Sequence, residues 1–194
     1  MTLRLPTFVL GLLLAGAAAA APLQQTETLS VGPAPGTLAI DAVSGRVIIG
    51  STASSRGGSA SLAVLERSGK LTTVATSSGT LDVAVSSARR KAVAALDWDG
   101  TVAIVDLDTL ATTSLVAGKR PSKVIIDDRA GVAYIVGNDM QMDMSTGWPT
   151  ATSTAYVSVI DLATNAVQTY SMGGYAPVDG ALSPDGKRLY VIGN

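Results

Sequence analysis

The stretch GYAPVDGALSPDGKRLYVIGN, residues 174–194, decides the fold, because its pattern occurs more than once in the chain. The segment PSKVIIDDRAGVAYIVGN, residues 121–138, can be laid over residues 177–194 without a gap. Two looser copies lie upstream, and the four units are 45, 41 and 56 residues apart, starting at Pro35, Thr80, Pro121 and Pro177. A period of this length predicts an architecture built from one recurring supersecondary unit.

Within each unit, short runs rich in valine and isoleucine alternate with turn residues and do not follow a helical spacing. Four strands fit one period, and in the second unit we expect them at residues 81–86, 91–96, 101–107 and 111–117. Asp99-Gly100 and Ser183–Gly186 are typical turn sequences.

Charged residues lie at the ends of several of these strands. Asp106 and Asp161, with Glu66 in the matching place, end the third strand of their units, where a side chain can accept hydrogen bonds from the following turn. Arg89, Arg90 and Lys91 fall in a turn of the second unit, and we expect them to form a solvated corner.

A four-stranded sheet of about 40 residues, repeated in tandem, is typical of a β-propeller blade. A close resemblance to the YVTN-type β-propeller repeat is found in residues 155–174, AYVSVIDLATNAVQTYSMGG, together with the following stretch that ends at Asn194. Residues 100–121 give a second good match. The resemblance implies an exported propeller, periplasmic or at the cell surface, commonly of seven blades. Such motifs specify a fold far more strongly than a function.

The expected fold class is therefore all-β, with four-stranded antiparallel blades in an incomplete arc of about three and a half blades within residues 36–194. Such an arc leaves apolar faces and strand edges in water. We therefore expect the remaining blades of a longer chain, or else self-association of a half-propeller. The expected blades lie at about 36–76, 81–117, 122–172 and, with two strands only, 178–194.

The first 21 residues have the pattern of a secretory signal peptide. Arg4 is followed by an apolar run, Phe8 to Leu14, and then by an alanine-rich segment that suits cleavage. The apolar run is shorter than the roughly 20 residues that a membrane span needs. We expect an exported protein, periplasmic or extracellular, with no membrane span after cleavage and with residues 22–35 as a lead-in to the repeats.

Composition excludes several kinds of chemistry. The chain has no cysteine and no histidine, so it lacks a thiolate nucleophile, a disulfide and the commonest general base. Its net charge of −1 and its aromatic content of 4% argue against nucleic-acid binding. No catalytic constellation emerges from the sequence, and no cofactor can be assigned.

Four residues occupy equivalent places early in the first strands, which line the central channel of a propeller. They lie two positions after the start of each unit and are Thr37, Asp82, Lys123 and Asp179. Carboxylates and a lysine at one level of otherwise apolar strands could bind a small polar ligand or a cation. The alternative is a hydrated channel mouth with no specific ligand.

The third unit carries an insertion, residues 139–155, between its second and third strands. Met140, Met142 and Met144 alternate there, and thioethers are ligands that suit Cu(I). Methionine is also an adaptable filler that could pack this loop against a neighbouring blade. Trp148 makes the loop a candidate contact for a protein partner.

Three functions remain open after these observations. The first is an exported, noncatalytic binding or scaffold module whose ligand or protein partner is unknown. The second is a lactonase-like propeller enzyme. Residues 62–75 resemble a connection between strands that is found in such enzymes. The third is a copper-handling protein that uses the methionine loop.

The signal sequence generates a direct prediction. Exported protein should begin near Ala21 or Pro22, because small residues precede this point, and mass spectrometry of the secreted chain measures it. Soluble exported protein that retains Arg4 would contradict the prediction.

Overall fold

The computed structural model describes residues 29–31, 34–52, 60–96, 100–139, 145–146, 154–173 and 177–193. The chain divides into two units, Met1–Ser30 and Val31–Asn194, and the fold described below is that of the second. Within the described residues, no helix has the length and apolar character needed to cross a membrane.

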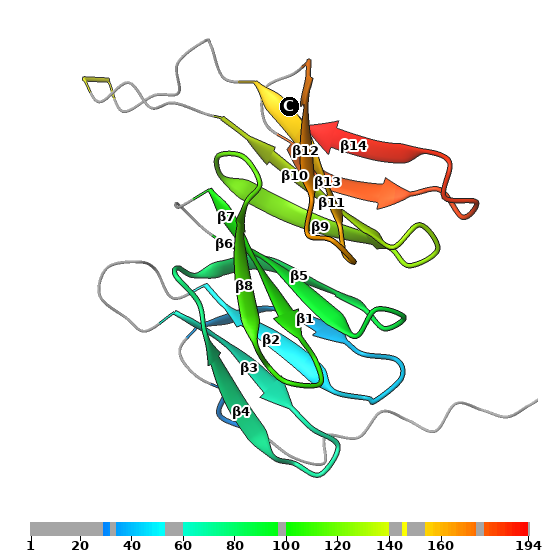
Figure 1. Cartoon of the computed structure of the whole chain (residues 1–194). Helices are drawn as coiled ribbons and strands as arrows, with labels where there is room; N and C mark the ends of the chain where they lie inside the picture. The colour runs from blue at the N-terminus through cyan, green and yellow to red at the C-terminus, as the bar shows by residue number, and fades with distance from the viewer. Residues whose placement is uncertain are drawn as a thin grey trace, which may run out of the picture. The chain divides into compact units, whose positions relative to one another are not determined.

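All the strands described are arranged in four antiparallel sheets, which we call blades 1 to 4 (Figure 1). Blade 1 contains β1 (Pro35–Ile40), β2 (Val47–Ser51), β3 (Ser61–Leu65) and β4 (Leu71–Ala75). Blade 2 contains β5 (Thr80–Ser86), β6 (Lys91–Leu96), β7 (Thr101–Asp106) and β8 (Thr112–Val116). Blade 3 contains β9 (Pro121–Asp127), β10 (Val132–Asn138), β11 (Ala155–Asp161) and β12 (Val167–Met172), and blade 4 contains β13 (Pro177–Leu182) and β14 (Leu189–Gly193).

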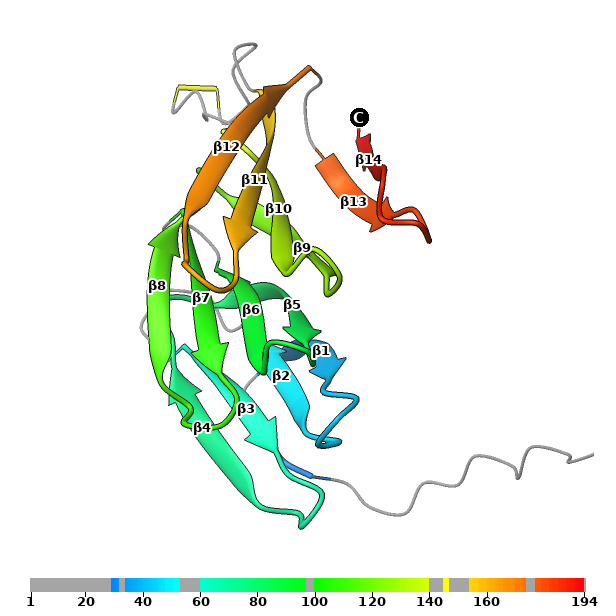
Figure 2. The ribbon, with the colours of Figure 1, turned by 45° about the vertical axis from the view of Figure 1, so that its right-hand side comes forward.

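Spatial order follows chain order in every blade, so each strand pairs with the next one along the chain. The first strands of successive blades contact one another, β1 with β5, β5 with β9 and β9 with β13. Figure 2 shows these first strands on one side of the unit and the fourth strands β4, β8 and β12 on the other. The all-β class and the four-stranded antiparallel blades expected from the sequence are confirmed.

The apolar core is divided into two layers by blade 2. Ala92, Ala94 and Leu96 of β6 pack towards blade 1, whereas Val93 and Ala95 pack towards blade 3. All five side chains are at most 1% exposed. Because both faces of the blade are covered, β6 is apolar at consecutive positions and lacks the polar alternation of a sheet with one wet face.

The strand-ending aspartates have the structural role expected of them. The carboxylate of Asp106 accepts hydrogen bonds from the backbone N–H groups of Asp108 at 3.0 Å and Thr109 at 2.8 Å. Asp161 repeats this turn with Ala163 and Thr164, both at 2.8 Å. These bonds satisfy amides that the ladder leaves unpaired, and they end the third strand at the same place in both blades.

The expectation of a solvated corner at Arg90 and Lys91 is wrong. Arg90 forms ion pairs with the fully buried carboxylate of Asp41 in blade 1 and with Asp108. Lys91 donates to the backbone carbonyl of Leu162 in blade 3. The sequence placed these cations in a turn but did not reveal that neighbouring blades supply acceptors for them.

A second polar donor repeats the Lys91 contact between blades 1 and 2. Arg46 precedes β2 and donates to the backbone carbonyl of Leu107, which follows β7 of blade 2. Leu107 and Leu162 both come directly after the turn-forming aspartates of their third strands. Each cation therefore reaches from its own blade to the same position of the following blade.

Tyr156 explains two glycines that belong to the repeat pattern. A Cβ atom at Gly118 would lie 2.5 Å from the Tyr156 ring, and one at Gly137 would lie 2.3 Å from its hydroxyl oxygen. Gly118 also has a φ of 98°, a backbone angle that residues with a side chain rarely adopt. Glycine at both positions makes room for the buried ring at the start of β11.

The buried Asp41 carboxylate predicts acid sensitivity. Burial acts to raise its pKa, but hydrogen bonds from Ser44, Arg90 and Ser87 outweigh burial and hold the pKa of this carboxyl well below its usual range. A carboxyl with a depressed pKa stabilises the fold above about pH 4, the pKa in the unfolded chain, and this stability is lost as the pH falls towards the folded pKa.

Asp41→Asn should therefore lower the free energy of unfolding by about 1–3 kcal/mol at pH 7 and flatten its decline below about pH 4. Urea denaturation at pH 7 and pH 3 measures both effects. The matched control is Asp108→Asn, since Asp108 pairs with the same arginine but is 61% exposed and should cost about 1 kcal/mol or less. Equal effects of the two variants would show that burial of Asp41 is unimportant.

Candidate functional site at the start of the first strands

A β-bulge lies at the same place in the first strand of every blade. The register shifts between Pro35 and Thr37, and again between Thr80 and Asp82. Blades 3 and 4 repeat the shift, so that Lys123 and Asp179 also come directly after an extra residue. Bulges re-aim the side chains that follow them.

The structure brings the four predicted channel residues into one continuous series of polar contacts. The Thr37 hydroxyl donates to Oδ1 of Asp82 at 3.2 Å. Nζ of Lys123 lies 3.5 Å from Oδ2 of Asp82 and 3.3 Å from Oδ1 of Asp179. Each contact joins one blade to the next, and we call the four residues the tetrad.

Asp82 also serves the backbone of the neighbouring blade. Its Oδ2 accepts the N–H of Val124 at 2.9 Å. β9 pairs with β10 alone, so on its other edge this N–H has no ladder partner. Asp82 therefore supplies the acceptor that the sheet does not, which satisfies a partly buried donor.

The charges of the tetrad stabilise one another. Partial burial acts to lower the pKa of the Lys123 ammonium, but the carboxylates of Asp82 and Asp179 outweigh it, so this pKa lies above its usual value. The backbone N–H of Gly180 and the Lys123 ammonium hold the pKa of the Asp179 carboxyl below its usual range. With two carboxylates and one ammonium, the tetrad carries one negative charge at neutral pH.

Part of the tetrad is open to solvent. The side chain of Asp179 is 56% exposed and that of Lys123 is 33% exposed, whereas that of Asp82 is only 16% exposed. Oδ1 of Asp179 receives both the Gly180 N–H at 2.8 Å and Lys123. Among the described residues, no protein donor to its other oxygen, Oδ2, is present, so this oxygen can accept from a bound molecule.

The ends of the second strands and the beginnings of the third strands lie at the same edge as the tetrad. In blade 3, Gly137 near the end of β10 pairs with both Pro121 and Tyr156, the beginnings of the adjacent strands. The proposed copper ligands Met140, Met142 and Met144, and Trp148, lie outside the described residues, so their roles stay predictions. Among the residues described, no group of three or more carboxylates could hold a metal ion.

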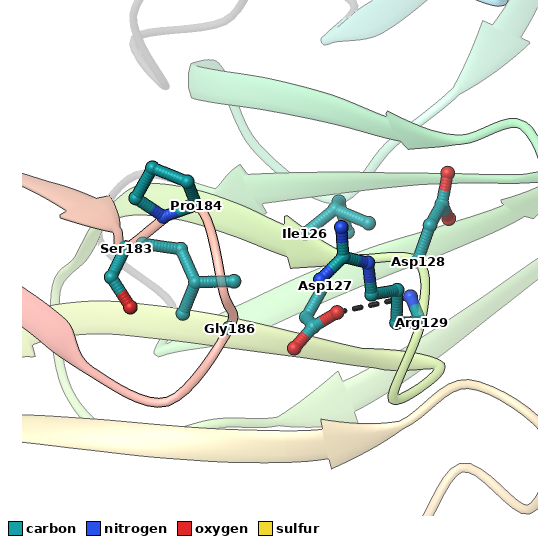
Figure 3. A pocket seen from close by; sticks show the side chains of 8 residues that line it. Ile126, Asp127, Asp128, Arg129, Ser183, Pro184 and Gly186 are labelled. Carbon is teal, nitrogen blue, oxygen red and sulfur yellow. Dashed lines mark hydrogen bonds between the residues drawn. The ribbon is translucent and has the colours of Figure 1, made fainter.

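A separate hollow lies at the other end of the first strands (Figure 3). Its volume is about 220 Å³, and it is lined by the turn after β9 and by the turn Ser183–Gly186 of blade 4. Asp127, which lies beside it, already accepts the N–H groups of Arg129 at 3.0 Å and Ala130 at 3.1 Å. These bonds give Asp127 a structural role in its own turn.

The comparisons identify the architecture. No protein-family model matches the sequence, and no curated protein matches it. The structure is similar to a chain in the crystal structure of a nidogen/laminin complex, with a TM-score of 0.59 and 12% sequence identity. The match covers 81% of this chain and 56% of that chain. It is also similar to the tricorn protease, with a TM-score of 0.58 and 18% identity over 87% and 16% of the two chains.

A third similar structure is the uncomplexed acylaminoacyl peptidase of Pyrococcus horikoshii, with a TM-score of 0.58 and 11% identity over 81% of this chain and 27% of that chain. The chain spans little more than half the length of the first of these three proteins and less of the other two. Identities of this size show the fold alone. Together with the blade topology they define a β-propeller domain, of which this chain contains three four-stranded blades and one two-stranded blade.

The tetrad predicts a specific loss of stability. Lys123→Met should lower the free energy of unfolding by about 1–2 kcal/mol at pH 7, because it leaves two nearby carboxylates without their common cation. The loss of stability caused by Lys123→Met should be smaller at pH 3, closer to the lowered pKa of the Asp179 carboxyl, because protonation of this carboxyl reduces its repulsion with Asp82. Urea denaturation at both pH values tests this.

The control for this variant is Lys70→Met in the exposed turn of blade 1, which should change stability by no more than about 0.5 kcal/mol. If Lys123→Met has the same small effect at pH 7, the tetrad does not hold the first strands together.

Proposed function

We propose that this chain is part of an exported, noncatalytic β-propeller module that binds a small polar ligand at the tetrad. The observation that carries the proposal is that Thr37, Asp82, Lys123 and Asp179, one from each blade, form one contact series with a solvent-exposed end. The export rests on the signal-peptide pattern of residues 1–21, and the place of action would be periplasmic or extracellular.

The charge balance of the tetrad favours one class of ligand. Its single net negative charge attracts a cation, and Oδ2 of Asp179, which receives no donor from the described residues, can accept a hydrogen bond from an ammonium or hydroxyl group. Lys123 has three N–H donors and two carboxylate neighbours, which leaves a donor for a ligand oxygen. A small molecule with both an ammonium and hydroxyl groups complements this arrangement.

The state of the carboxylates supports binding rather than catalysis. A general acid needs a carboxyl whose pKa is raised towards neutrality. The pKa of Asp179, the most exposed carboxyl of the tetrad, is instead lowered by Gly180 and Lys123. Such a group remains an ionised hydrogen-bond acceptor, which suits the recognition of a cationic ligand.

Glucosamine is a suitable first probe, because it combines an ammonium with hydroxyl groups, and glucose is its uncharged counterpart. We expect glucosamine to bind more tightly than glucose, and Asp179→Asn to weaken glucosamine binding at least tenfold. Nuclear magnetic resonance titration measures affinities in the millimolar range.

Asp185→Asn provides the matched control, since Asp185 is an exposed carboxylate of the same blade but lies in the turn at the far end of β13. This variant should bind glucosamine like the unmodified chain. Equal loss of binding in both variants, or equal binding of glucose and glucosamine, would contradict recognition by the charged tetrad.

A further inference from the structure

At the ends of the first strands that lie opposite the tetrad, a polar contact joins blade 1 to blade 2. Asp41 directly follows β1, and its buried carboxylate accepts a hydrogen bond from the Ser87 hydroxyl of blade 2. The same hydroxyl accepts the backbone N–H of Ala42 at 2.9 Å. These bonds close the junction between the turns of the two blades.

The junction between blades 2 and 3 is closed by the equivalent pair of residues. Ser86 occupies the place of Asp41, six positions after the start of its unit. Asp128 occupies the place of Ser87, seven positions after the start of its unit. The Ser86 hydroxyl donates to Oδ1 of Asp128, so a hydroxyl again meets a carboxylate, with donor and acceptor exchanged.

The junction between blades 3 and 4 cannot form this contact. Asp127 occupies the first of the two places, but Pro184 occupies the second and has no hydroxyl or carboxylate. A hollow of about 220 Å³ lies between the two turns instead (Figure 3). The hollow therefore reflects the residue that faces Asp127, because the same junction is closed twice elsewhere in the chain.

Asp127 has one carboxylate oxygen left for a ligand. The residue is only 7% exposed, and its Oδ1 accepts the N–H groups of Arg129 and Ala130. Among the residues that the structure describes, none donates to its Oδ2. This oxygen faces the turn of blade 4, since a Cβ atom at Gly186 would lie 3.2 Å from it. A nearly buried carboxylate oxygen without a donor is costly unless a bound molecule supplies one.

Arg129 places a cation on the blade 3 side of the same hollow. Figure 3 shows its side chain extending back past Asp127 and Ile126, while the Asp128 side chain points away from the hollow. Arg129 is exposed, and within the described part of the chain its guanidinium has no partner. The hollow therefore presents one carboxylate acceptor and one group of cationic donors.

Apolar side chains form other parts of the hollow. Ile126 of β9 and Leu182 of β13 are half-buried there, and the exposed ring of Pro184 lies on the blade 4 side. An aliphatic group placed between these side chains would be removed from water.

We propose that this hollow binds a free α-amino acid with an aliphatic side chain. The ammonium of the ligand donates to Oδ2 of Asp127, and its carboxylate accepts from the Arg129 guanidinium, whose planar fork suits a carboxylate. The aliphatic side chain of the ligand lies against Leu182 and Pro184. Both charges of the ligand are then paired, and the site is separate from the tetrad at the other end of the first strands.

L-Leucine is the probe, and two analogues each lack one of its charged groups. 3-Methylbutylamine has no carboxylate, and 4-methylpentanoate has no ammonium. Nuclear magnetic resonance titration of the full chain should show millimolar binding of leucine and at least tenfold weaker binding of each analogue. An analogue that binds as tightly as leucine would overturn the proposal, because only one charge would then be recognised. Failure of leucine to bind at tens of millimolar would also overturn it.

Two variants remove the charges that the ligand meets. Asp127→Asn and Arg129→Met should each weaken leucine binding at least tenfold. Asparagine retains an oxygen that can accept the N–H groups of the turn, so the turn should persist. The matched control is Asp106→Asn, which makes the same change in the turn after β7 and should bind leucine like the unmodified chain. Equal loss of binding in the two asparagine variants would contradict a specific role of Asp127.

Pro184→Ser tests the hollow without removing either charge. Serine supplies the hydroxyl that Ser87 provides for Asp41, so it should donate to Asp127 and compete with the ammonium of leucine. Leucine binding should fall at least tenfold, while circular dichroism and the midpoint of urea unfolding verify that the variant is folded. A folded Pro184→Ser chain that binds leucine like the unmodified chain would overturn the proposal. The comparison of leucine with its analogues needs no variant and remains decisive if one fails to fold.

Discussion

The structure depends on burial of apolar side chains between consecutive blades. The second strand of blade 2, β6, is apolar on both sides, and one sheet alone would leave both of these sides in water. Removing an apolar side chain such as Val93 from water contributes roughly 1.5–3 kcal/mol, so a few such residues equal the net stability of a domain. Each blade is therefore stable only as part of a series.

Polar contacts determine how consecutive blades are aligned. Near the start of the first strands, the tetrad links neighbouring blades through Thr37, Asp82, Lys123 and Asp179. At the other end, Arg90 joins the buried Asp41, and Lys91 reaches the Leu162 carbonyl. Apolar packing is not directional, whereas these hydrogen bonds and ion pairs fix the register of one blade against the next.

The bulges in the first strands place the side chains of the proposed binding site. A bulge after the first residue of each first strand turns one side chain per blade towards its neighbours. Repetition of the unit therefore places four side chains from distant parts of the sequence within hydrogen-bonding reach. Each blade contributes its own residue at this position, from Thr37 to Asp179, and together these side chains give the site its charge.

The sequence by itself determined the all-β class, the repeat and the starting points of the blades, because strand and turn preferences act over a few residues and recur with the period. It also identified the four tetrad residues by their equivalent positions and the turn role of Asp106 and Asp161. Only the tertiary structure decided which tetrad side chains pair, that Asp82 accepts the Val124 N–H, and that Arg90 and Lys91 bridge blades. These contacts join residues about 40 or more positions apart, and their partners depend on how the bulges and neighbouring blades orient each side chain, which no local pattern records.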